Sequence, residues 1–284
     1  MKTFVLYHQN CMDGTASAWS AWMFYKTKGI SPKFIEVGYQ AKIHLSDEEI
    51  KDSDIIIADF SYSESELRRV EKLAKSIIVL DHHKTSQAHL EKLSFASFDL
   101  DKSGAMLTWL HFHPGVKIPR LIQYVQDRDL WLFKLPFSKE VNAVVRSFNR
   151  VGLDMFSEFE KLSNRLEDDT EFLGIVNEGS AILKADQQNV EIVIKRSLSF
   201  VSIAGYSNIP AVNSSVYESE IGSRLLSLYP DAPFSAIYYD VEGGTSVYWS
   251  LRSRSGSNID VGKIAGTLGG GGHPAASAFR VVKS

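Results

Sequence analysis

The stretches DIIIAD (54–59) and SIIVLD (76–81) decide the fold. Each is a short run of branched apolar residues that ends in an aspartate, without the alternation typical of a strand with one face in water. Such runs are typical of strands buried on both faces of a parallel sheet. FVLY (4–7) and KFIEV (33–37) are two more strand candidates, and helical patterns separate the four stretches. The first eighty residues therefore predict an α/β fold, with a parallel sheet between two layers of helices.

The pattern changes twice farther along the chain. Residues 103–200 are mostly helical in pattern, and 168–197 form one long amphipathic stretch suited to a linker helix. Beyond 199 the chain is rich in β-strand patterns, with GlyGly at 243–244 suited to a hairpin turn. We therefore expect an N-terminal domain over 1–150, a helical linker over 151–198 and a smaller α/β domain over 199–284. A chain of 284 residues is long enough for two domains.

Composition excludes several classes of protein. The 284 residues carry a net charge of −3, which argues against a protein that coats long nucleic acids. A single cysteine, Cys11, excludes an internal disulfide and fits a reducing compartment. The sequence has no apolar run long enough for a transmembrane helix and no secretory signal pattern. We expect a soluble cytoplasmic protein without a membrane partner.

Polar residues follow three of the predicted strands, in the segment 8–13, at Asp59 and in the segment 81–83. Because ligands of such sheets bind at the carboxyl ends of the strands, we expect these side chains to converge. Together with one aspartate farther along, they make six candidate metal ligands: His8, Asp13, Asp59, His82, His83 and Asp127. This mixture of carboxylate and imidazole suits Mn²⁺, and also Mg²⁺, Fe²⁺ or Co²⁺. Two such ions can activate water and neutralise a phosphoryl group.

These residues carry a family resemblance. VLDHHKT (79–85) resembles the signature of the DHH phosphoesterase superfamily, HQNCMDGTASA (8–18) its first motif and IADFS (57–61) its second. YVQDRDLW (124–131) resembles the fourth motif. SLRSRSGSNIDVGKIAGTLGGGGHPAASAF (250–279) resembles the C-terminal DHH-associated domain, with its glycine-rich GGGGH box. The resemblance covers nearly the whole chain and implies a Rossmann-like DHH domain, with the active site in a cleft between two domains.

The resemblance also implies roles for single residues. One metal ion would be held by His8 and Asp59, and a second by Asp13, Asp59, His82 and Asp127, so that Asp59 bridges them. His83 would contact the phosphate, and Asp81 would orient a ligand or water beside the ions. Asp129 competes with Asp127 for the fourth motif, and we prefer Asp127 because it follows the apolar stretch LIQYV closely.

Cys11 departs from the family pattern. Many members have two aspartates, two residues apart, where this chain has Cys11 and Asp13. Three interpretations stay open. Cys11 is a thiolate ligand, which would shift metal preference toward Mn²⁺, Fe²⁺ or Zn²⁺; it is a bystander; or one metal site and the catalysis are lost.

In the C-terminal segment the glycine run 269–272 lies between a helical pattern and an apolar strand. It therefore belongs to a domain and is not a flexible linker. Consecutive glycines let backbone N–H groups approach an anion. The resemblance assigns substrate binding to this loop and its neighbours: Arg252, Gly270, Gly271, Gly272 and His273.

Within the family the chain resembles the nanoRNase (oligoribonuclease) branch. That resemblance implies metal-dependent hydrolysis of short oligonucleotides (nanoRNA) or linear dinucleotides to nucleoside 5′-monophosphates, with two divalent ions, most simply Mn²⁺. Alternatives are a cyclic-dinucleotide phosphodiesterase and a 3′,5′-bisphosphonucleotide phosphatase. A nucleotide-binding sensor with a decayed metal site is the alternative that is not an enzyme. The resemblance also allows a homodimer.

Overall fold

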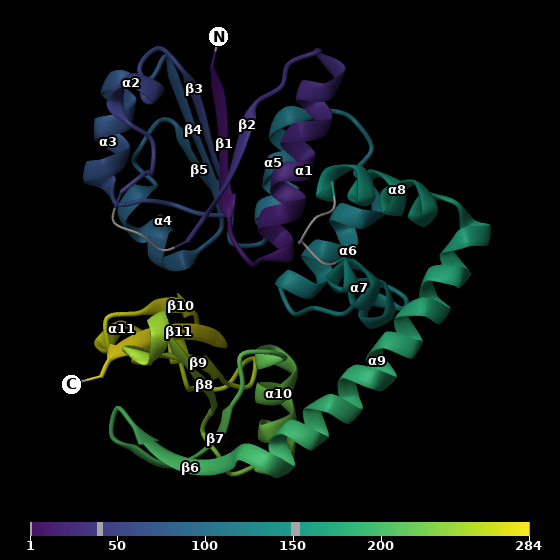
Figure 1. Cartoon of the computed structure of the whole chain (residues 1–284), viewed down its shortest axis with the longest axis vertical. Helices are drawn as coiled ribbons and strands as arrows, with labels where there is room; N and C mark the ends of the chain where they lie inside the picture. Colours follow the sequence, from purple (N-terminus) through teal and green to yellow (C-terminus); the bar gives the residue numbers. More distant parts are fainter. Residues whose placement is uncertain (1, 39–41, 149–153, 284) are drawn as a thin grey trace. The chain divides into compact units, whose positions relative to one another are not determined.

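The computed structural model describes residues 2–38, 42–148 and 154–283. The chain forms two compact units that divide within one long helix, between Leu183 and Lys184. Figure 1 follows the chain through both units and labels their helices and strands.

A five-stranded parallel sheet is the centre of the first unit. Its strands are β1 (Thr3–His8), β2 (Lys33–Val37), β3 (Asp54–Ala58), β4 (Ser76–Asp81) and β5 (Ala96–Phe98). Their spatial order is β2-β1-β3-β4-β5, and every neighbouring pair is parallel. The four predicted strands and the parallel arrangement are confirmed. Strand β5 was not predicted, because its three residues ASF form no apolar run.

Helices cover both faces of this sheet, with α2 and α3 on one side and α1 and α5 on the other (Figure 1). The first five helices are α1 (Met12–Thr27), α2 (Asp47–Ile50), α3 (Glu64–Leu73), α4 (Lys84–Leu90) and α5 (Gly104–Phe112). On β3, Ile55 and Ile57 pack in a buried cluster with Leu67 of α3. Ile56 between them packs in another cluster with Leu107 of α5. Burial on both faces explains why the strand is apolar at each position from Ile55 to Ala58.

The helix ends follow the expected capping chemistry. Helix α1 ends at Thr27, and Gly29 adopts a φ of +66°, which a glycine reaches without a steric penalty. Ser46 forms a capping box at α2, and the Ser103 side chain accepts a hydrogen bond from Met106 N at the start of α5. These caps satisfy backbone groups that have no partner within the helix itself.

The rest of the first unit is helical. It contains α6 (Arg120–Asp129), α7 (Ser138–Ser147), α8 (Met155–Glu167) and the start of α9 (Asp169–Ser197). Phe159 and Leu162 of α8 are buried in one cluster with Trp19 of α1. Part of the predicted linker 151–198 thus packs within the first unit, while the expected boundary at 150–151 lies outside the described residues. The domain limits stay a prediction.

The second unit contains a six-stranded mixed sheet in the order β10-β11-β9-β8-β7-β6. Its strands are β6 (Leu198–Ile203), β7 (Tyr206–Asn213), β8 (Ser235–Val241), β9 (Ser246–Arg252), β10 (Gly271–His273) and β11 (Ala276–Val282). Two helices, α10 (Glu218–Leu228) and α11 (Val261–Thr267), complete this α/β unit. The turn η1 (Glu242–Gly244) joins β8 to β9 at the predicted hairpin. No helix in the described parts of the chain is long and apolar enough to cross a membrane.

The glycine run differs from its prediction as a loop. Gly271–His273 form β10, which pairs in antiparallel fashion with β11. A Cβ atom on Gly270 would lie 2.0 Å from the Ala278 carbonyl oxygen, and one on Gly272 would lie 2.6 Å from that of Ala276. Glycines at these two positions therefore allow a backbone approach that any side chain would block.

Candidate metal centre

Asp59 stands at the carboxyl end of β3, and its side chain is almost fully buried. The residue has a φ of +56°, a strained value for a residue that is not glycine and one that clusters at functional sites. Gly104 packs directly against it, since a Cβ atom on Gly104 would lie 2.5 Å from Asp59 Cβ. Sequence analysis missed Gly104; its position directly after a serine N-cap was the available signal.

Three carboxylates surround one nitrogen of His82, at the end of β4. Nε2 lies 3.1 Å from Asp59 Oδ1, 3.6 Å from Asp13 Oδ2 and 3.5 Å from Asp129 Oδ2. Asp13, His82 and Asp129 form one group whose ligand atoms all lie within 4.8 Å of one another. They come from α1, the turn after β4 and the end of α6, so three distant segments meet here.

Asp13 is held by the start of a neighbouring helix. Its two carboxylate oxygens accept hydrogen bonds from Gly104 N at 2.5 Å and Ala105 N at 3.0 Å, in the first turn of α5. The helix dipole and the two N–H groups favour a carboxylate there. Gly104 therefore contacts both aspartates. Its N–H donates a hydrogen bond to Asp13, and its lack of a side chain leaves space for Asp59.

A second ligand group adjoins the first. His8, Asp59 and His83 offer ligand atoms within 4.8 Å of one another, and His8 Nδ1 lies 3.6 Å from Asp59 Oδ2. Since Asp59 also contacts His82 at 3.1 Å, this one carboxylate connects the two groups. A shared carboxylate between two ligand sets is the arrangement that a two-metal site needs.

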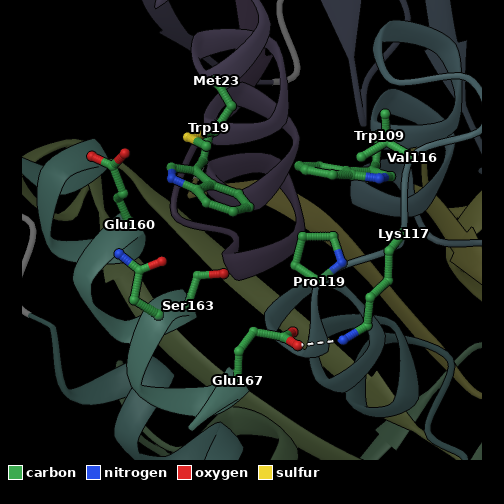
Figure 2. Close-up of a pocket in the computed structure, with 10 residues that line it drawn as sticks. Trp19, Met23, Trp109, Val116, Lys117, Pro119, Glu160, Ser163 and Glu167 are labelled. Atoms are coloured by element: carbon green, nitrogen blue, oxygen red, sulfur yellow. Dashed lines mark hydrogen bonds and ion pairs between the residues drawn. The ribbon is translucent and has the colours of Figure 1, made fainter.

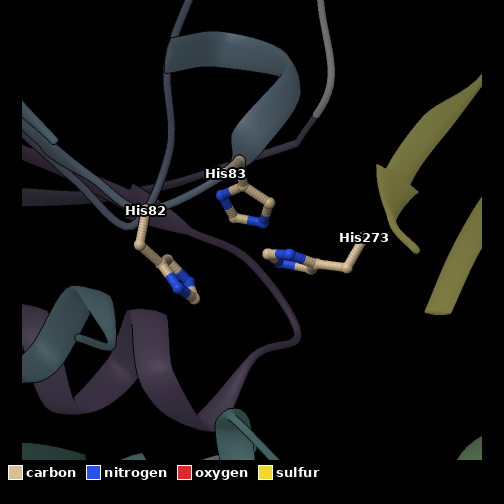
Figure 3. Close-up of side chains that lie close together, drawn as sticks. All are labelled: His82, His83 and His273. Atoms are coloured by element: carbon tan, nitrogen blue, oxygen red, sulfur yellow. The ribbon is translucent and has the colours of Figure 1, made fainter. Parts of the chain in front are cut away.

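Asp81 organises the turn that carries both histidines. Its Oδ1 accepts hydrogen bonds from His82 N at 2.8 Å and His83 N at 3.2 Å, and lies 2.6 Å from His83 Nδ1. Ser61 Oγ donates to the other oxygen at 2.6 Å, a contact that sequence analysis did not anticipate. With both oxygens engaged, Asp81 orients other groups. Figure 3 shows the rings of His82 and His83 leaving this turn in different directions, and their planes are inclined by 59°.

The buried charges of the cluster depend on one another. Burial opposes the charged form of His82, but Asp59, Asp129 and Asp13 raise its pKa to about 10. Burial and the neighbouring Asp129 and Asp59 raise the pKa of Asp13 well above its usual value. The pKa of Asp59 is well below its usual value, because contacts with His8 and His82 overcome its burial. The positive charge of protonated His82 thus offsets part of the negative charge of the neighbouring carboxylates.

The residues fit a divalent cation. Asp59 Oδ2 is buried without a hydrogen bond among the described residues, so one carboxylate oxygen remains for a ligand. Three aspartates with two histidines also match the hard and intermediate ligands that Mn²⁺ and Mg²⁺ accept. A dication in place of the His82 proton would relieve the repulsion among Asp13, Asp59 and Asp129.

Asp127 and Asp129 exchange the positions that we expected for them. The Asp127 carboxylate accepts hydrogen bonds from Lys134 N at 2.9 Å and Leu135 N at 3.1 Å, and belongs to neither ligand group. Asp129, two residues on, brings its carboxylate to His82. On a helix, residues two apart point to different sides, so only one of the pair can face the site. The geometry therefore favours Asp129 over Asp127 as a ligand, a correction to our preference.

Cys11 lies close to the cluster without joining it. It is the N-cap residue of α1 and makes no capping hydrogen bond with its side chain. Burial and the charges of Asp59, Asp129 and Asp13 raise the pKa of its thiol well above the usual value. Among the described residues neither of the two groups around Asp59 and His82 includes Cys11, so the geometry gives no support to the thiolate interpretation.

Four of the five residues expected to bind substrate in the second unit lie in strands of its sheet, and Gly270 directly precedes β10. Arg252 is the last residue of β9, and its guanidinium donates to Ser250 Oγ, the Leu251 carbonyl oxygen and Ser219 Oγ. His273 is the last residue of β10. Gly270 and Gly272 are required for packing against β11, as described above. Their role in anion binding stays a prediction.

A separate hollow of about 290 Å³ lies among the helices of the first unit (Figure 2). The indoles of Trp19 and Trp109 form its apolar wall, and the ion pair between Lys117 and Glu167 lies at its edge. None of the residues that line it belongs to either ligand group. This hollow is therefore separate from the two ligand groups.

Comparisons with known proteins find relatives that match nearly the whole chain. No family model matches the chain. An uncharacterised protein of Acanthamoeba polyphaga mimivirus is 32% identical over 98% of this chain and 68% of its own length. The oligoribonuclease NrnB of Bacillus subtilis is 24% identical over 97% of this chain and 72% of its own length.

Among solved structures, RecJ of Thermus thermophilus in complex with Mn²⁺ aligns with a TM-score of 0.53 at 15% identity. The alignment covers 99% of this chain and 49% of RecJ, so the fold of both units recurs in that protein. These likenesses, together with the aspartates and histidines assembled at the ends of β1, β3 and β4, identify the chain as a member of the DHH superfamily of phosphoric ester hydrolases.

Proposed function

We propose that this chain is a metal-dependent phosphodiesterase that hydrolyses short oligonucleotides or linear dinucleotides to nucleoside 5′-monophosphates. The observation that carries the proposal is the pair of ligand groups joined by Asp59. The relative that is named oligoribonuclease NrnB supports the substrate class. The net charge of −3 also suits a short substrate better than a long nucleic acid.

Five residues would hold two divalent cations. We propose His8 and Asp59 for the first ion, and Asp13, Asp59, His82 and Asp129 for the second. When bound, such ions supply Lewis acidity to the phosphoryl group and lower the pKa of water. Mn²⁺ is our first choice because imidazole and carboxylate are mixed, and RecJ was solved with this ion.

His83 and Asp81 act on the substrate side of this centre. Burial opposes the charged form of His83, but the Asp81 carboxylate raises the pKa of the ring above its usual value and so stabilises the imidazolium. We propose that this imidazolium donates a hydrogen bond to a phosphate oxygen and stabilises the charge that develops there. Asp81 holds the ring in position through the contact with Nδ1.

The second unit would contribute substrate binding through Arg252, His273 and the segment Gly270–Gly272. This part of the proposal rests on the resemblance of the glycine-rich segment to the DHH-associated domain. We also propose a cytoplasmic location, from the single cysteine of the sequence.

A hydrolysis assay with product analysis tests the proposal. Labelled RNAs of two, three, five and twenty-four nucleotides are incubated with Mn²⁺, beside linear and cyclic dinucleotides and a 3′,5′-bisphosphonucleotide. We expect rapid release of nucleoside 5′-monophosphates from the two- to five-mers and none with Asp59→Asn. Faster turnover of the cyclic dinucleotide or the bisphosphonucleotide would show that the enzyme acts on that substrate class and not on short oligonucleotides. Binding without turnover of any substrate would indicate a sensor.

A further inference from the structure

The segment directly after the proposed ligand Asp129 has an unusual backbone. Trp131, Phe133 and Phe137 have φ values of +56°, +48° and +57°. Bulky aromatic residues rarely adopt this left-handed conformation, and here three do so within seven residues. Such clusters occur where surrounding contacts hold a segment in a shape that serves function.

Asp127 supplies most of the contacts that hold this segment. Its carbonyl oxygen accepts hydrogen bonds from Leu132 N at 2.8 Å and Phe133 N at 3.2 Å. Its carboxylate accepts two more, from Lys134 N at 2.9 Å and Leu135 N at 3.1 Å. Asp127 thus accepts hydrogen bonds from the backbone N–H groups of four successive residues, 132–135. The loop is fixed to α6, the same helix whose end places Asp129 beside His82.

The loop presents a tryptophan to solvent. Trp131 is 45% exposed, and the edge of its ring meets Phe133 with ring centroids 4.9 Å apart. The other tryptophans, all within the described residues, are less exposed; Trp249, for example, stacks on Tyr238 and Phe279 in the second unit. An exposed indole in a rigid setting is a surface on which a planar base can stack at little entropic cost.

Trp131 is also close to the metal centre. It lies two residues after Asp129, so their Cα atoms are at most about 7 Å apart. We propose that Trp131 is the stacking surface for a nucleobase of the substrate whose phosphate lies at the ions, and that Asp127 is the positioning residue of this surface. The inference rests on the proposed function and adds a base-recognition element to it.

The test compares two substrates that differ only in the base. They are 5′-phosphorylated diadenylate and the same molecule with abasic riboses, hydrolysed with Mn²⁺ by the full chain. Stacking on an aromatic side chain contributes about 1–3 kcal/mol per base, or about 5- to 150-fold. Trp131→Ala should lower kcat/KM on diadenylate by such a factor, mainly through KM, and change the abasic reaction less than about twofold. Trp131→Phe should recover part of the loss.

Two further variants separate stacking from general damage. Phe137→Ala is the matched control, because Phe137 is 49% exposed, has a left-handed φ and packs against Phe172. We expect it to leave unchanged the ratio of kcat/KM on diadenylate to kcat/KM on the abasic substrate. Asp127→Asn should reduce that ratio as Trp131→Ala does, while the number of bound Mn²⁺ ions stays the same. Equal losses on both substrates with Trp131→Ala, or no loss at all, would overturn the inference.

Failure of the proposed function would look different, since the wild-type chain would then hydrolyse neither substrate. In that case quenching of tryptophan fluorescence by diadenylate tests the stacking surface without turnover. Quenching that is lost in Trp131→Phe would support it, and identical quenching in both proteins would contradict it.

Discussion

The carboxyl edge of the first sheet and the glycine-rich edge of the second carry the two motifs of this chain that stand out most. At the first edge, buried carboxylates and imidazoles meet, and one oxygen of Asp59 has no hydrogen bond among the described residues. At the second, Gly270 and Gly272 provide the space in which β10 and β11 approach each other. Polar groups that are buried together need a ligand to explain them, whereas a glycine run is first explained by packing.

Removal of the shared carboxylate should have the largest effect. Asp59→Asn keeps the size of the side chain but removes the charge that serves both ligand groups. We expect the rate of dinucleotide hydrolysis to fall by about 10³-fold or more, because both ions lose a ligand. Steady-state assays across Mn²⁺ concentrations measure the loss. Asp99→Asn, at a half-buried carboxylate paired with Lys102, is the control and should remain active.

The two aspartates of α6 provide a sharper comparison. Asp129→Asn should weaken Mn²⁺ binding by about 100-fold or more, since its carboxylate faces His82 at 3.5 Å. Asp127→Asn should leave Mn²⁺ binding within about threefold, and should lower the free energy of unfolding by about 1–3 kcal/mol as two amides lose a charged acceptor. Metal titration and denaturant unfolding measure the two effects. The reverse order would restore Asp127 as the ligand.

Gly104 connects packing to the metal centre. Gly104→Ala would place a methyl group 2.5 Å from Asp59 Cβ, so Asp59 or α5 must move. We expect a loss of about 1–3 kcal/mol in stability and about 10- to 100-fold in Mn²⁺ affinity. Gly174→Ala in α9 is the matched control, because nothing lies within 4 Å of the new methyl group. Unfolding curves and metal titration on both variants decide whether Gly104 has this role.

At the second edge the corresponding substitution should lower the stability of the chain. Gly270→Ala would place a methyl group 2.0 Å from the Ala278 carbonyl oxygen and should destabilise the chain by about 1–3 kcal/mol. Gly266→Ala in α11 meets nothing within 4 Å and should be neutral or stabilising. If Gly270→Ala instead kept full stability and raised KM for dinucleotides, the anion-binding role would take precedence over packing.

Cys11→Ser should have the smallest effect. Because neither ligand group around Asp59 contains the thiol, we expect Mn²⁺-dependent hydrolysis to stay within about tenfold of the wild-type rate. A larger loss, together with a change in preference between Mn²⁺ and Mg²⁺, would show that the sulfur is a ligand.

Much of the first unit was predictable from sequence, because its signals are local. DIIIAD and SIIVLD are apolar at successive positions since Ile55 and Ile57 meet one helical layer and Ile56 the other. Parallel topology then predicted that side chains at the strand ends converge. In the structure Asp59 and His82 lie close to His8 and Asp13. Sequence alone could not show which way α6 rotates, and this rotation decides between Asp127 and Asp129.

The second unit was harder to predict at its glycine run. Whether GGGGH forms a loop or a strand depends on the partner strand β11, which no local pattern of the run reveals. Gly104 and Ser61 were missed for a similar reason, since their roles exist only through contacts with Asp59 and Asp81.

The number of manganese ions bound per chain shows whether two metal sites share Asp59. Wild-type chain and Asp59→Asn are equilibrated with Mn²⁺, freed of excess ion, and analysed for bound manganese per chain. We expect two manganese ions per chain in the wild type and at most one, weakly held, in the variant. Equal manganese in both proteins would contradict a shared carboxylate at Asp59.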